Sequence, residues 1–461
     1  MEFSQTPLGA EYELIMREGK GVYYMYDATF ATERENIDAL QVVSMDFIRD
    51  YRNSASDEIL IKLVVPWGQY LNRVLPFKEN LKVTITRSEV DTVSGEIVGT
   101  RVEQTFIAFL PPETETGMLD NSPETATEFS ADISGLKIVQ VQLQEEAFRR
   151  ARSEMVGGVF RDSSPYEVLI SLLHNSIRQM DLEIAERIVG VHATPPNNTA
   201  KRGTTLIPHG TPLVALADKL QTQLGGIYTA GIGCYLQKGY WHVWPLYNYK
   251  LYDSAERTAL FILAPSGRYR GVERTYRMVD KHLTVFITGE VLRQDPSEIL
   301  LLNEGNGVRF ANADAMMEGF FEVSGNKAVA KRTNNANEYE AINRKGVSMS
   351  RITEDMATTN NFNEASKVAA RNGAFITMNW ENSNPDLIIP GLQCEIGFLV
   401  EGDVCFINGV VVHAHGYSAL SGTGLHQRMH QITTEVVCMV DRQSPVYAKF
   451  LSSQQSNSTQ T

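Results

Sequence analysis

Four histidines near the end of the sequence are the densest group of side chains that could do chemistry. They are His413, His415, His426 and His430. The first two are separated by one residue in a strand-like run, so their side chains share a face, and the last two have the spacing of a helical ligand pair. Such a set could bind Zn²⁺, but the flanking runs Val404–Val412 and Ile432–Val440 favour strands, in which residues four apart do not converge. Because no thiol or carboxylate stands at motif spacing, we interpret them as strand-end or interface histidines and predict no metal site.

Other motifs of catalysis or cofactor binding are weak or missing. Gly231-Ile232-Gly233 lies within a predicted hairpin strand and Gly422-Thr423-Gly424 in a polar turn, so neither opens a helix as a nucleotide-binding loop does. The sequence contains no phosphate-loop motif, no nucleophile elbow and no HExxH. Acidic residues are scattered along the sequence, and no pattern nominates two of them as the pair of catalytic carboxylates that glycoside hydrolysis requires. We therefore predict no catalytic residue, no cofactor and no enzymatic activity.

Two further groups of residues could contact a ligand. An aromatic set could stack on sugars or bases, but hairpin aromatics more often belong to a core or an interface, which is our interpretation. The segment Arg268–Arg277 is basic and could meet a phosphate or a partner, although a solvated face is the simpler interpretation. The aromatic set consists of Tyr235, Tyr240, Trp241, Trp244 and Tyr247.

Composition limits the classes of partner. Lys and Arg number 42 and Asp and Glu 55, so the formal net charge is −13. A general nucleic-acid binder needs a basic footprint, which this balance argues against. The charge remains compatible with a wall past which DNA slides, because like charges prevent sticking.

The cysteines and the apolar runs indicate in which cellular compartment the protein is made. Cys234, Cys394, Cys405 and Cys438 lie far apart in apolar strand-like runs, which predicts buried free thiols rather than a disulfide framework. The longest apolar run is about the size of Ala259–Pro265, whereas a membrane helix needs about 20 residues. The first residues carry no secretory signal pattern. We expect a soluble protein made in a cytoplasm, without membrane insertion.

Residues 1–150 predict a first β-barrel domain. Short runs rich in β-branched and aromatic residues alternate with turn residues, which is typical of a barrel or sandwich. Pro111–Ser134 contains six acids and no Lys or Arg, and it predicts a long exposed loop. The expected strands are Gly21–Asp27, Ala39–Phe47, Glu58–Val65, Asn80–Arg87, Glu96–Val102, Glu103–Leu110 and Leu136–Leu143.

Residues 151–250 predict a small α+β domain of helices and an aromatic hairpin. Ser164, Pro165 and Glu167 form a capping box at the start of one helix. A second helix is expected to begin at Thr211 as the cap and Pro212 as the first helical residue. The other expected elements are a helix over Glu145–Met155, a strand over Ile184–His192, a loop over Thr194–Pro208, a helix stop at Gly225-Gly226, and hairpin strands over Ile227–Leu236 and Tyr240–Tyr247.

The rest of the chain predicts a second β-barrel domain formed by residues 251–294 and 360–445. Residues 295–359 are rich in Gly and Asn and predict an irregular insertion, and residues 446–461 predict a disordered tail. A helix is expected over Asn361–Asn372. The expected strands are Thr258–Ala264, Leu283–Gly289, Ala374–Trp380, Leu392–Val400, Val404–His415 and His430–Val440.

The order of these elements resembles a known family. The stretches are LKIVQVQL (136–143), VFRDSSPYEVLISLL (159–173), the Thr-Pro-led helix and hairpin, NNFNEASKVAARNG (360–373) and LIIPGLQCEIGF (387–398). Over roughly Tyr12 to Arg442 this pattern resembles the central hub proteins of contractile phage baseplates, as in T-even-like bacteriophages, and related contractile injection machines. The loop Pro111–Ser134 and the insertion 295–359 are longer than the family pattern, so partner contacts there do not carry over.

The resemblance implies a mainly β fold with α+β parts, containing two antiparallel, tail-tube-like β-barrel domains, the small α+β domain and the insertion. It implies a homotrimer whose six barrels adapt a sixfold tail tube to a threefold central spike. The implied partners are the tail tube protein, the central spike protein and baseplate wedge proteins. DNA would pass through the channel without specific binding. The implied location is the tail baseplate of a virion, assembled in the host cytoplasm, and hubs of this kind have no active site.

Two alternatives remain open. Another ring-forming tail-tube or connector protein would assemble with sixfold rather than threefold symmetry. A tail-associated glycan-binding or cell-wall-degrading enzyme would need clustered carboxylates in a cleft, which the sequence does not nominate.

Overall fold

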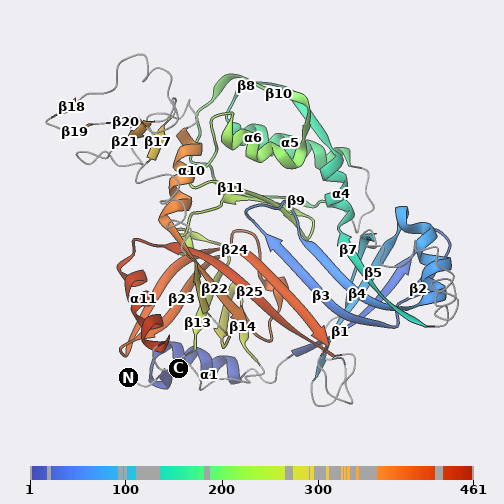
Figure 1. The fold of residues 1–461 in the computed structure, drawn as a ribbon. Coiled ribbons are helices and arrows are strands. Elements are labelled where there is room, and N and C mark those ends of the chain that lie inside the picture. Colours follow the sequence, from blue (N-terminus) through green and yellow to red (C-terminus); the bar gives the residue numbers. More distant parts are fainter. Residues whose placement is uncertain are drawn as a thin grey trace.

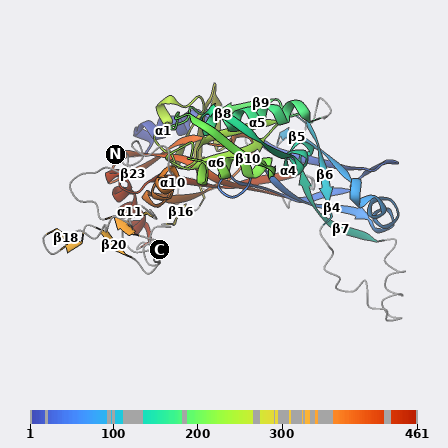
Figure 2. The same cartoon turned by 90° about the horizontal axis from the view of Figure 1, so that it is seen from above.

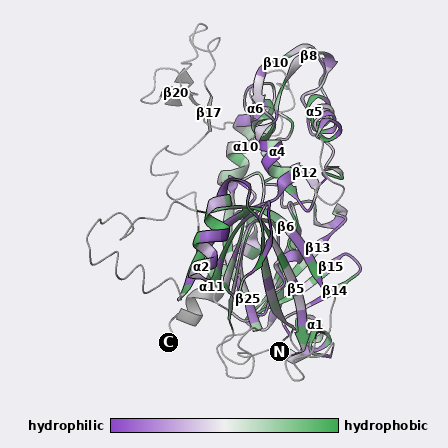
Figure 3. Cartoon of the chain, turned by 90° about the vertical axis from the view of Figure 1, so that its right-hand side faces the viewer, coloured by the Kyte–Doolittle hydropathy of each residue, from purple (hydrophilic) through white to green (hydrophobic). Residues whose placement is uncertain are grey.

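A computed structural model describes residues 3–17, 22–91, 97, 101–110, 135–180, 187–264, 274–289, 291–294, 361–420 and 429–458, with short strands between 308 and 341. The fold is mainly β with smaller α+β parts, which confirms the predicted class. Within the described residues, a sheet of 15 strands runs through an elongated body (Figure 1, Figure 2). A smaller α+β part lies above this sheet, and the view turned about the vertical axis shows the same arrangement (Figure 3).

Part of the sheet closes on itself. The circuit, which we call the ring, runs through β24 (Asp403–Leu420), β3 (Gln41–Asp50), β4 (Glu58–Pro66), β7 (Leu136–Gln144), β6 (Val102–Phe109), β5 (Lys82–Asp91), β1 (Val22–Ala31) and β25 (Met429–Asp441), which pairs again with β24. Each pairing is antiparallel. A closed circuit leaves no free strand edge. The short β2 (Asn36–Asp38) adds to the end of β1.

Side chains fill the interior of the ring. Because successive residues of a strand point to opposite faces, every second residue of these strands faces inward. The buried cluster includes Tyr26, Phe30, Ile61, Leu63 and Val83. Short helical turns, α2 (Trp67–Gln69), η2 (Tyr70–Val74) and η3 (Leu75–Asn80), connect β4 with β5. The expected strand Glu96–Val102 lies largely outside the described residues, and the expected loop Pro111–Ser134 lies entirely outside them.

The second sheet shares two strands with the ring. It runs β14 (Tyr276–Val279), β15 (His282–Ile287), β13 (Thr258–Leu263), β23 (Gln393–Val400), β24, β25, β22 (Gly373–Trp380) and β16 (Val291–Gln294). It differs from the antiparallel barrel expected here, because β13 pairs in parallel with both β15 and β23, and no pairing of the described residues joins β14 to β16. β13 packs Phe261 into one cluster and Ile262 into another. Burial on both faces is typical of parallel strands.

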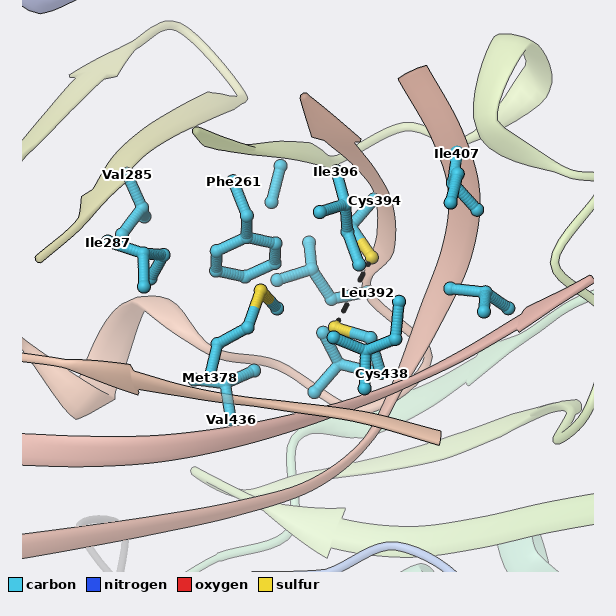
Figure 4. Close-up of a cluster of buried hydrophobic side chains, with 14 of the residues drawn as sticks. Phe261, Val285, Ile287, Met378, Leu392, Cys394, Ile396, Ile407, Val436 and Cys438 are labelled. Carbon is cyan, nitrogen blue, oxygen red and sulfur yellow. Dashed lines mark hydrogen bonds between the residues drawn. The ribbon is translucent and has the colours of Figure 1, made fainter. Parts of the chain in front are cut away.

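The long hairpin of β24 and β25 joins the two cores. One face of β25 contributes Ile432 to the interior of the ring. The same face then contributes Val436, Cys438 and Val440 to the core of the second sheet (Figure 4). A bulge between Val411 and His413 adjusts the register of β24 with β25. These pairings cross the domain boundaries expected from the sequence, so the division into domains stays a prediction.

Two helices that the sequence did not predict cover the second sheet. α1 (Pro7–Arg17) packs Leu8 and Ile15 against Ile262 and Phe286. α11 (Pro445–Ser458) buries Tyr447 and Phe450, and the Phe450 ring meets the Phe398 ring edge-on at 5.2 Å.

The disordered tail expected over residues 446–461 is therefore wrong for the stretch that α11 covers, and the last three residues lie outside the described part. Two aromatic residues three positions apart share a helix face, so they dock on the sheet and order the segment. Polar composition alone did not reveal this.

The α+β module, as we call residues 145–247, lies above the ring and the second sheet (Figure 1). It contains α4 (Glu146–Ser153), β8 (Met155–Ser163), α5 (Pro165–Gln179), β9 (Gly190–Ala193), β10 (Arg202–Pro212), η5 (Leu213–Ala215), α6 (Leu216–Thr222), β11 (Ile232–Gln237) and β12 (Tyr240–Pro245). The capping box is confirmed: the Ser164 hydroxyl accepts from the Glu167 N–H at 3.2 Å, and the Glu167 carboxylate accepts from the Ser164 N–H at 2.8 Å.

The hairpin is confirmed, with a turn at Lys238-Gly239 where both residues have positive φ, although its first strand begins at Ile232 rather than at Ile227. The helix stop at Gly225 and Gly226 is also confirmed, since φ is +97° and +76° there. Of the strand expected over Ile184–His192, residues up to 186 lie outside the described part, and β9 occupies the end.

The start predicted for the second helix of the module is wrong. Thr211 and Pro212 end β10, paired with Val156 and Met155 of β8, and the helical turn begins only at Leu213 without a side-chain cap. The loop expected over Thr194–Pro208 is wrong from residue 202 onward for the same reason. A Thr-Pro pair fits a helix start and the end of an edge strand equally well, because Pro needs no N–H partner in either place.

α10 (Asn361–Asn372) confirms the predicted helix, and its Phe362 is buried beside Gly226 of the module. Of the predicted insertion 295–359, the structure describes β17 (Val308–Phe310) and β20 (Ala330–Arg332) paired with β21 (Tyr339–Ala341), and β18 (Val323–Ser324) paired with β19 (Lys327–Ala328). The remainder of the insertion lies outside the described residues.

Candidate functional site

The structure separates the histidines that the sequence grouped. His413 and His415 lie two apart on β24, and His415 Nε2 lies 3.0 Å from Asp46 Oδ1. His426 lies outside the described residues. Across the described part of the chain, no group of three or more His, Cys, Asp or Glu side chains is placed to hold a metal ion.

His430 is a satisfied core histidine. It is buried, its Nε2 donates to the Val42 carbonyl at 3.1 Å, and the Ser418 hydroxyl lies 3.2 Å from its Nδ1. The Tyr26 ring meets it edge-on at 5.0 Å. Burial lowers its pKa to about 4, although the hydrogen bond to Val42 opposes this shift. His430 is therefore neutral at pH 7 and fixes the start of β25 against β3.

Three of the five residues of the aromatic set belong to a core, as we interpreted them. Tyr235 and Trp244 are buried in the cluster of the second sheet, and Trp241 is buried in the cluster of the module. Tyr240 and Tyr247 are half-buried. The three buried rings hold the hairpin between two cores, so protein covers their faces.

The basic segment is only partly described. Residues 268–273 lie outside the described part. Arg274 Nε donates to the Tyr276 carbonyl at 3.3 Å, and its guanidinium lies over the Tyr276 ring at 5.8 Å. The described end of this segment thus packs on its own strand.

All four cysteines are free thiols, as predicted. Cys394, Cys405 and Cys438 are buried, and Cys234 is half-buried. The Cys394 and Cys438 sulfurs lie 3.5 Å apart in the core of the second sheet (Figure 4). Burial raises the pKa of both Cys234, to about 12, and Cys438, so these thiols stay protonated and unreactive.

A cluster of charged side chains that the sequence did not nominate lies where the ring, the module and the second sheet meet. We call it the charged junction. Its three acids and three bases come from six separate segments: Arg49 of β3, Asp57 just before β4, Arg87 of β5, Glu145 at the start of α4, Lys238 in the hairpin turn, and Asp386 of η7 (Pro385–Leu387).

Arg49 connects two of the acids. Its Nε donates to Asp57 Oδ2 at 2.9 Å, and its guanidinium contacts Asp386 Oδ1 at 3.5 Å and the Pro385 carbonyl. Its side chain is only 3% exposed. Burial of a guanidinium works against the charged form, but Asp57, Tyr51 and Asp386 together outweigh it, so the pKa of Arg49 rises above its usual value. Arg49 therefore stays positively charged, and this buried charge depends on the nearby carboxylates of Asp57 and Asp386.

Asp57 also forms hydrogen bonds with the β11–β12 hairpin. The Tyr235 hydroxyl donates to Asp57 Oδ1 at 3.1 Å, and Gln237 Nε2 donates to the same oxygen at 3.2 Å. Next to these contacts, the Leu236 N–H donates to the Ala55 carbonyl at 2.8 Å. The loop before β4 therefore holds β11 through both backbone and side chains.

Asp386 is surrounded by cations. Arg87 Nη2 lies 2.5 Å from Asp386 Oδ2, and Lys238 Nζ lies 3.5 Å from Oδ1. Burial acts to raise the pKa of Asp386, but Arg87, Lys238 and Arg49 together outweigh it and hold the pKa well below its usual value. This carboxylate thus ties the segment before β23 to the ring and to the hairpin.

The pKa of Glu145 is shifted in the opposite direction from that of Asp386. Burial raises its pKa to about 7, and the neighbouring charge of Asp57 adds to the rise, whereas Arg49 and Lys238 oppose it. Glu145 therefore titrates near neutral pH. The charged junction therefore positions parts of the chain electrostatically, and its paired groups point to structural rather than reaction chemistry.

Sequence reasoning missed this site because its members are distant along the chain. Arg49 and Asp386 are 337 positions apart. No spacing rule links such positions. The one local signal was the Lys238-Gly239 turn, which fixed the place of Lys238 at a hairpin tip but not what it meets there.

Apolar side chains are also exposed on the outer face of the ring. Leu136 and Ile138 of β7 are 68% and 62% exposed. Val64 of β4 pairs with Ile138, and its carbonyl accepts from the N–H of Leu40, which is also exposed. We call Leu40, Leu136 and Ile138 the apolar face of the ring. A similar cross-strand pair, Val159 and Leu206, is exposed on the β8–β10 ribbon.

Within the described residues, no helix has the length and apolar character to cross a membrane. No protein-family model and no curated protein matches the sequence. Two similar solved structures are a chain of the Francisella PdpA-VgrG complex in its half-lidded form and the 43 kDa tail protein of prophage MuSo2 from Shewanella oneidensis. Each is 8% identical to this chain.

The Francisella match covers 95% of this chain and 61% of that chain, with a TM-score of 0.37, so this chain spans less than two thirds of it. The Shewanella match covers 89% of this chain and 98% of that chain, with a TM-score of 0.43. Both TM-scores lie below 0.5, so neither likeness carries a fold or a function over to this chain. The resemblance to baseplate hubs stays an expectation.

Proposed function

We propose that this protein is a structural hub of a contractile phage tail or a related injection machine. In this role three copies form a ring-shaped assembly that joins a sixfold tail tube to a threefold central spike. The observation that carries the proposal is the closed antiparallel ring fused through one hairpin to a second curved sheet. With one ring and one second sheet in each chain, a trimer would present six β units, alternating in kind, around one axis.

The filled interior of the ring places a condition on the assembly. Tyr26, Phe30 and Leu63 are among the side chains that occupy it. A channel for DNA therefore has to lie between copies rather than through a ring. With a net charge of −13, the walls of such a channel would repel DNA, which would pass without specific binding.

The apolar face of the ring supports contact between copies. Exposed branched side chains on a rigid sheet are costly in water, and their burial contributes about 25 cal/mol for each Å² removed from solvent. In the proposed assembly this face meets a neighbouring copy. The tail tube protein, the spike protein and the wedge proteins would meet other surfaces, in a virion baseplate assembled in the host cytoplasm.

The first test is the absolute mass of the purified chain by light scattering on a sizing column. We expect three copies per particle. Replacing Ile138 with Lys places a charge in the apolar face and should convert the trimer to smaller species, because an unpaired charge buried at a contact is unfavourable. The matched control is Gln140→Lys, which adds the same charge two residues along the exposed face of β7.

The outcomes separate the candidate roles. A hexamer would replace the hub with a tube or connector role. A trimer that withstands Ile138→Lys as well as it withstands Gln140→Lys would remove the apolar face from the contact between copies. A stable monomer at every concentration would count against the self-assembled hub.

A further inference from the structure

The two faces of the β8–β10 ribbon have different surroundings. Successive residues of a strand point to opposite faces, and Val156 and Ile207 point into the core of the module. On the opposite face Val159 pairs with Leu206, and each of these side chains is 60% exposed. A two-stranded ribbon is marginally stable by itself, so cover over this second face would stabilise it.

The ribbon and the apolar face of the ring lie on different parts of the chain. In Figure 1 the ribbon forms the top of the module, above α5 and α6, and the ring lies below the module; Figure 3 shows the same order. The two apolar patches of one chain therefore do not cover each other. A closed ring of identical copies requires two such surfaces, because each copy offers one surface to the copy before it and a different surface to the copy after it.

The distribution of charge favours contact between ring and module. Residues 1–144, which supply six of the eight strands of the ring, contain 12 Lys and Arg and 23 Asp and Glu, a formal net charge of −11. Residues 145–247 contain 10 Lys and Arg and 9 Asp and Glu, a formal net charge of +1. Two rings brought face to face would repel each other, whereas the module adds no like charge.

The ribbon also carries a cation beside its apolar pair. Arg161 comes two residues after Val159, so it lies on the same face of β8, where it is exposed and pairs with Thr204 of β10. A guanidinium at the rim of an apolar contact suits an acidic partner surface, because opposite charges orient the two surfaces as they meet.

We propose that the exposed face of the β8–β10 ribbon packs on the apolar face of the ring of the next copy. Val159 and Leu206 then lie against the aliphatic side chains of β7, and Arg161 lies over the acidic surface around them. This inference rests on the proposed assembly role and names what covers the apolar face of the ring. The contact is heterologous, so each copy uses both patches once and the chain of contacts closes on itself.

Cysteine cross-linking of the full chain tests the contact. The double variant Ile138→Cys/Leu206→Cys places one new thiol in each patch, and oxidation by copper(II) phenanthroline should join neighbouring copies through disulfides. We expect covalent dimers and trimers on a denaturing gel, which a reducing agent returns to monomers. Neither single variant should cross-link, because like positions do not meet in a heterologous contact. Cross-linked dimers of either single variant would overturn the proposal.

Val279→Cys/Leu206→Cys is the matched control. Val279 is an aliphatic residue of β14 that is 42% exposed, so its replacement is an accessible thiol outside both patches. We expect no more cross-linking than in wild type, where Cys394, Cys405 and Cys438 are buried. A control that cross-links as fast as Ile138→Cys/Leu206→Cys would show random collision and would remove the contact.

An exchange of charge gives an independent readout in case the cysteine variants assemble poorly. Ile138→Glu and Leu206→Lys should each raise the concentration at which the assembly dissociates by about tenfold or more, since each buries an unpaired charge. In the double variant the two new charges face each other, so it should dissociate at a lower concentration than either single variant. Losses that simply add would mean that the two positions do not meet.

Light scattering on the wild-type chain separates failure of this contact from failure of the assembly role. A wild-type particle of three copies, together with an Ile138→Cys/Leu206→Cys protein of the same mass that does not cross-link, would remove the contact and leave the assembly role. A wild-type chain that stays monomeric would remove both.

Discussion

Asp386 is the residue on which three cations of the charged junction converge. Arg87 and Lys238 both contact its carboxylate, and Arg49 approaches one oxygen at 3.5 Å. The Arg49 guanidinium is almost completely buried, so it cannot turn to water when its partner is lost. Loss of one acid would therefore leave positive charges close together with little solvent to screen them.

Asp386→Asn should lower the free energy of unfolding by about 2–4 kcal/mol at pH 7, because it leaves buried cations without a counter-charge. Chemical denaturation compared with wild type measures this loss. Asp403→Asn, which removes a carboxylate from an exposed strand end, should change stability by less than about 0.5 kcal/mol.

The stability difference between wild type and Asp386→Asn should also depend on pH, in a direction that the pKa shift of Asp386 fixes. The folded pKa of Asp386 is depressed, so its contribution is present above its ordinary value of 3.8 and is lost as pH falls below it. The stability difference between wild type and Asp386→Asn should therefore shrink in acid. A difference that stays constant down to pH 2 would mean that hydrogen bonding rather than charge makes the contribution.

At the scale of single elements, α5 shows how a local sequence rule succeeds. Ser164 and Glu167 each satisfy a backbone N–H that the first turn of a helix leaves unpaired. The helix then buries Leu169 and Leu173 against the core of the module. Both the cap and the apolar face are encoded within fifteen residues, so they could be predicted without tertiary information.

Ser164→Ala should cost about 1 kcal/mol in the free energy of unfolding, because the N–H of Glu167 loses its acceptor. The control, Ser171→Ala, changes an exposed serine within the same helix, where Ala is the better helix former, and should not destabilise. Urea melts monitored by circular dichroism would distinguish the two. Equal stabilities would mean that tertiary packing alone holds the first turn.

Other elements could not be predicted, for identifiable reasons. The β8–β10 ribbon exposes Val159 and Leu206 on its outer face, so its alternation does not separate a polar side from an apolar one. α11 is ordered by Phe450 docking on Phe398, a contact between distant segments. The charged junction has the same origin, since long-range pairing brings its residues together.

At the scale of the whole molecule, the β24–β25 hairpin contributes strands to both the ring and the second sheet. Ile432 and Val436 lie on one face of β25, four residues apart, yet belong to different cores. A change in one core is thus transmitted along a continuous hydrogen-bonded strand. We expect both parts to unfold in a single transition.

Val436→Ala, placed in the core of the second sheet, should lower the stability of the whole chain by about 2 kcal/mol. Trp67 reports on the ring and Trp380 on the second sheet, so variants that keep one of them allow each part to be followed by fluorescence. Both signals should shift to the same lower midpoint. Gln431→Ala, on the exposed side of β25, is the control, and a ring midpoint that stays in place would separate the two parts.

The hairpin also sets the order of events on the ribosome. The sheet β3-β4-β7-β6-β5-β1 is complete once residue 144 has emerged. β2 covers only the end of the β1 edge, and β3 and the start of β1 receive their partners only when β24 and β25 arrive. At about 5–20 residues per second, the chain from β1 to the end of β25 takes on the order of 20–80 s to synthesise. For most of that time two strand edges stand open beside those of other nascent chains, which favours intermolecular pairing. The yield of folded protein should therefore depend on the rate of translation and on how closely nascent chains are spaced. This holds even though the finished ring has no free strand edge.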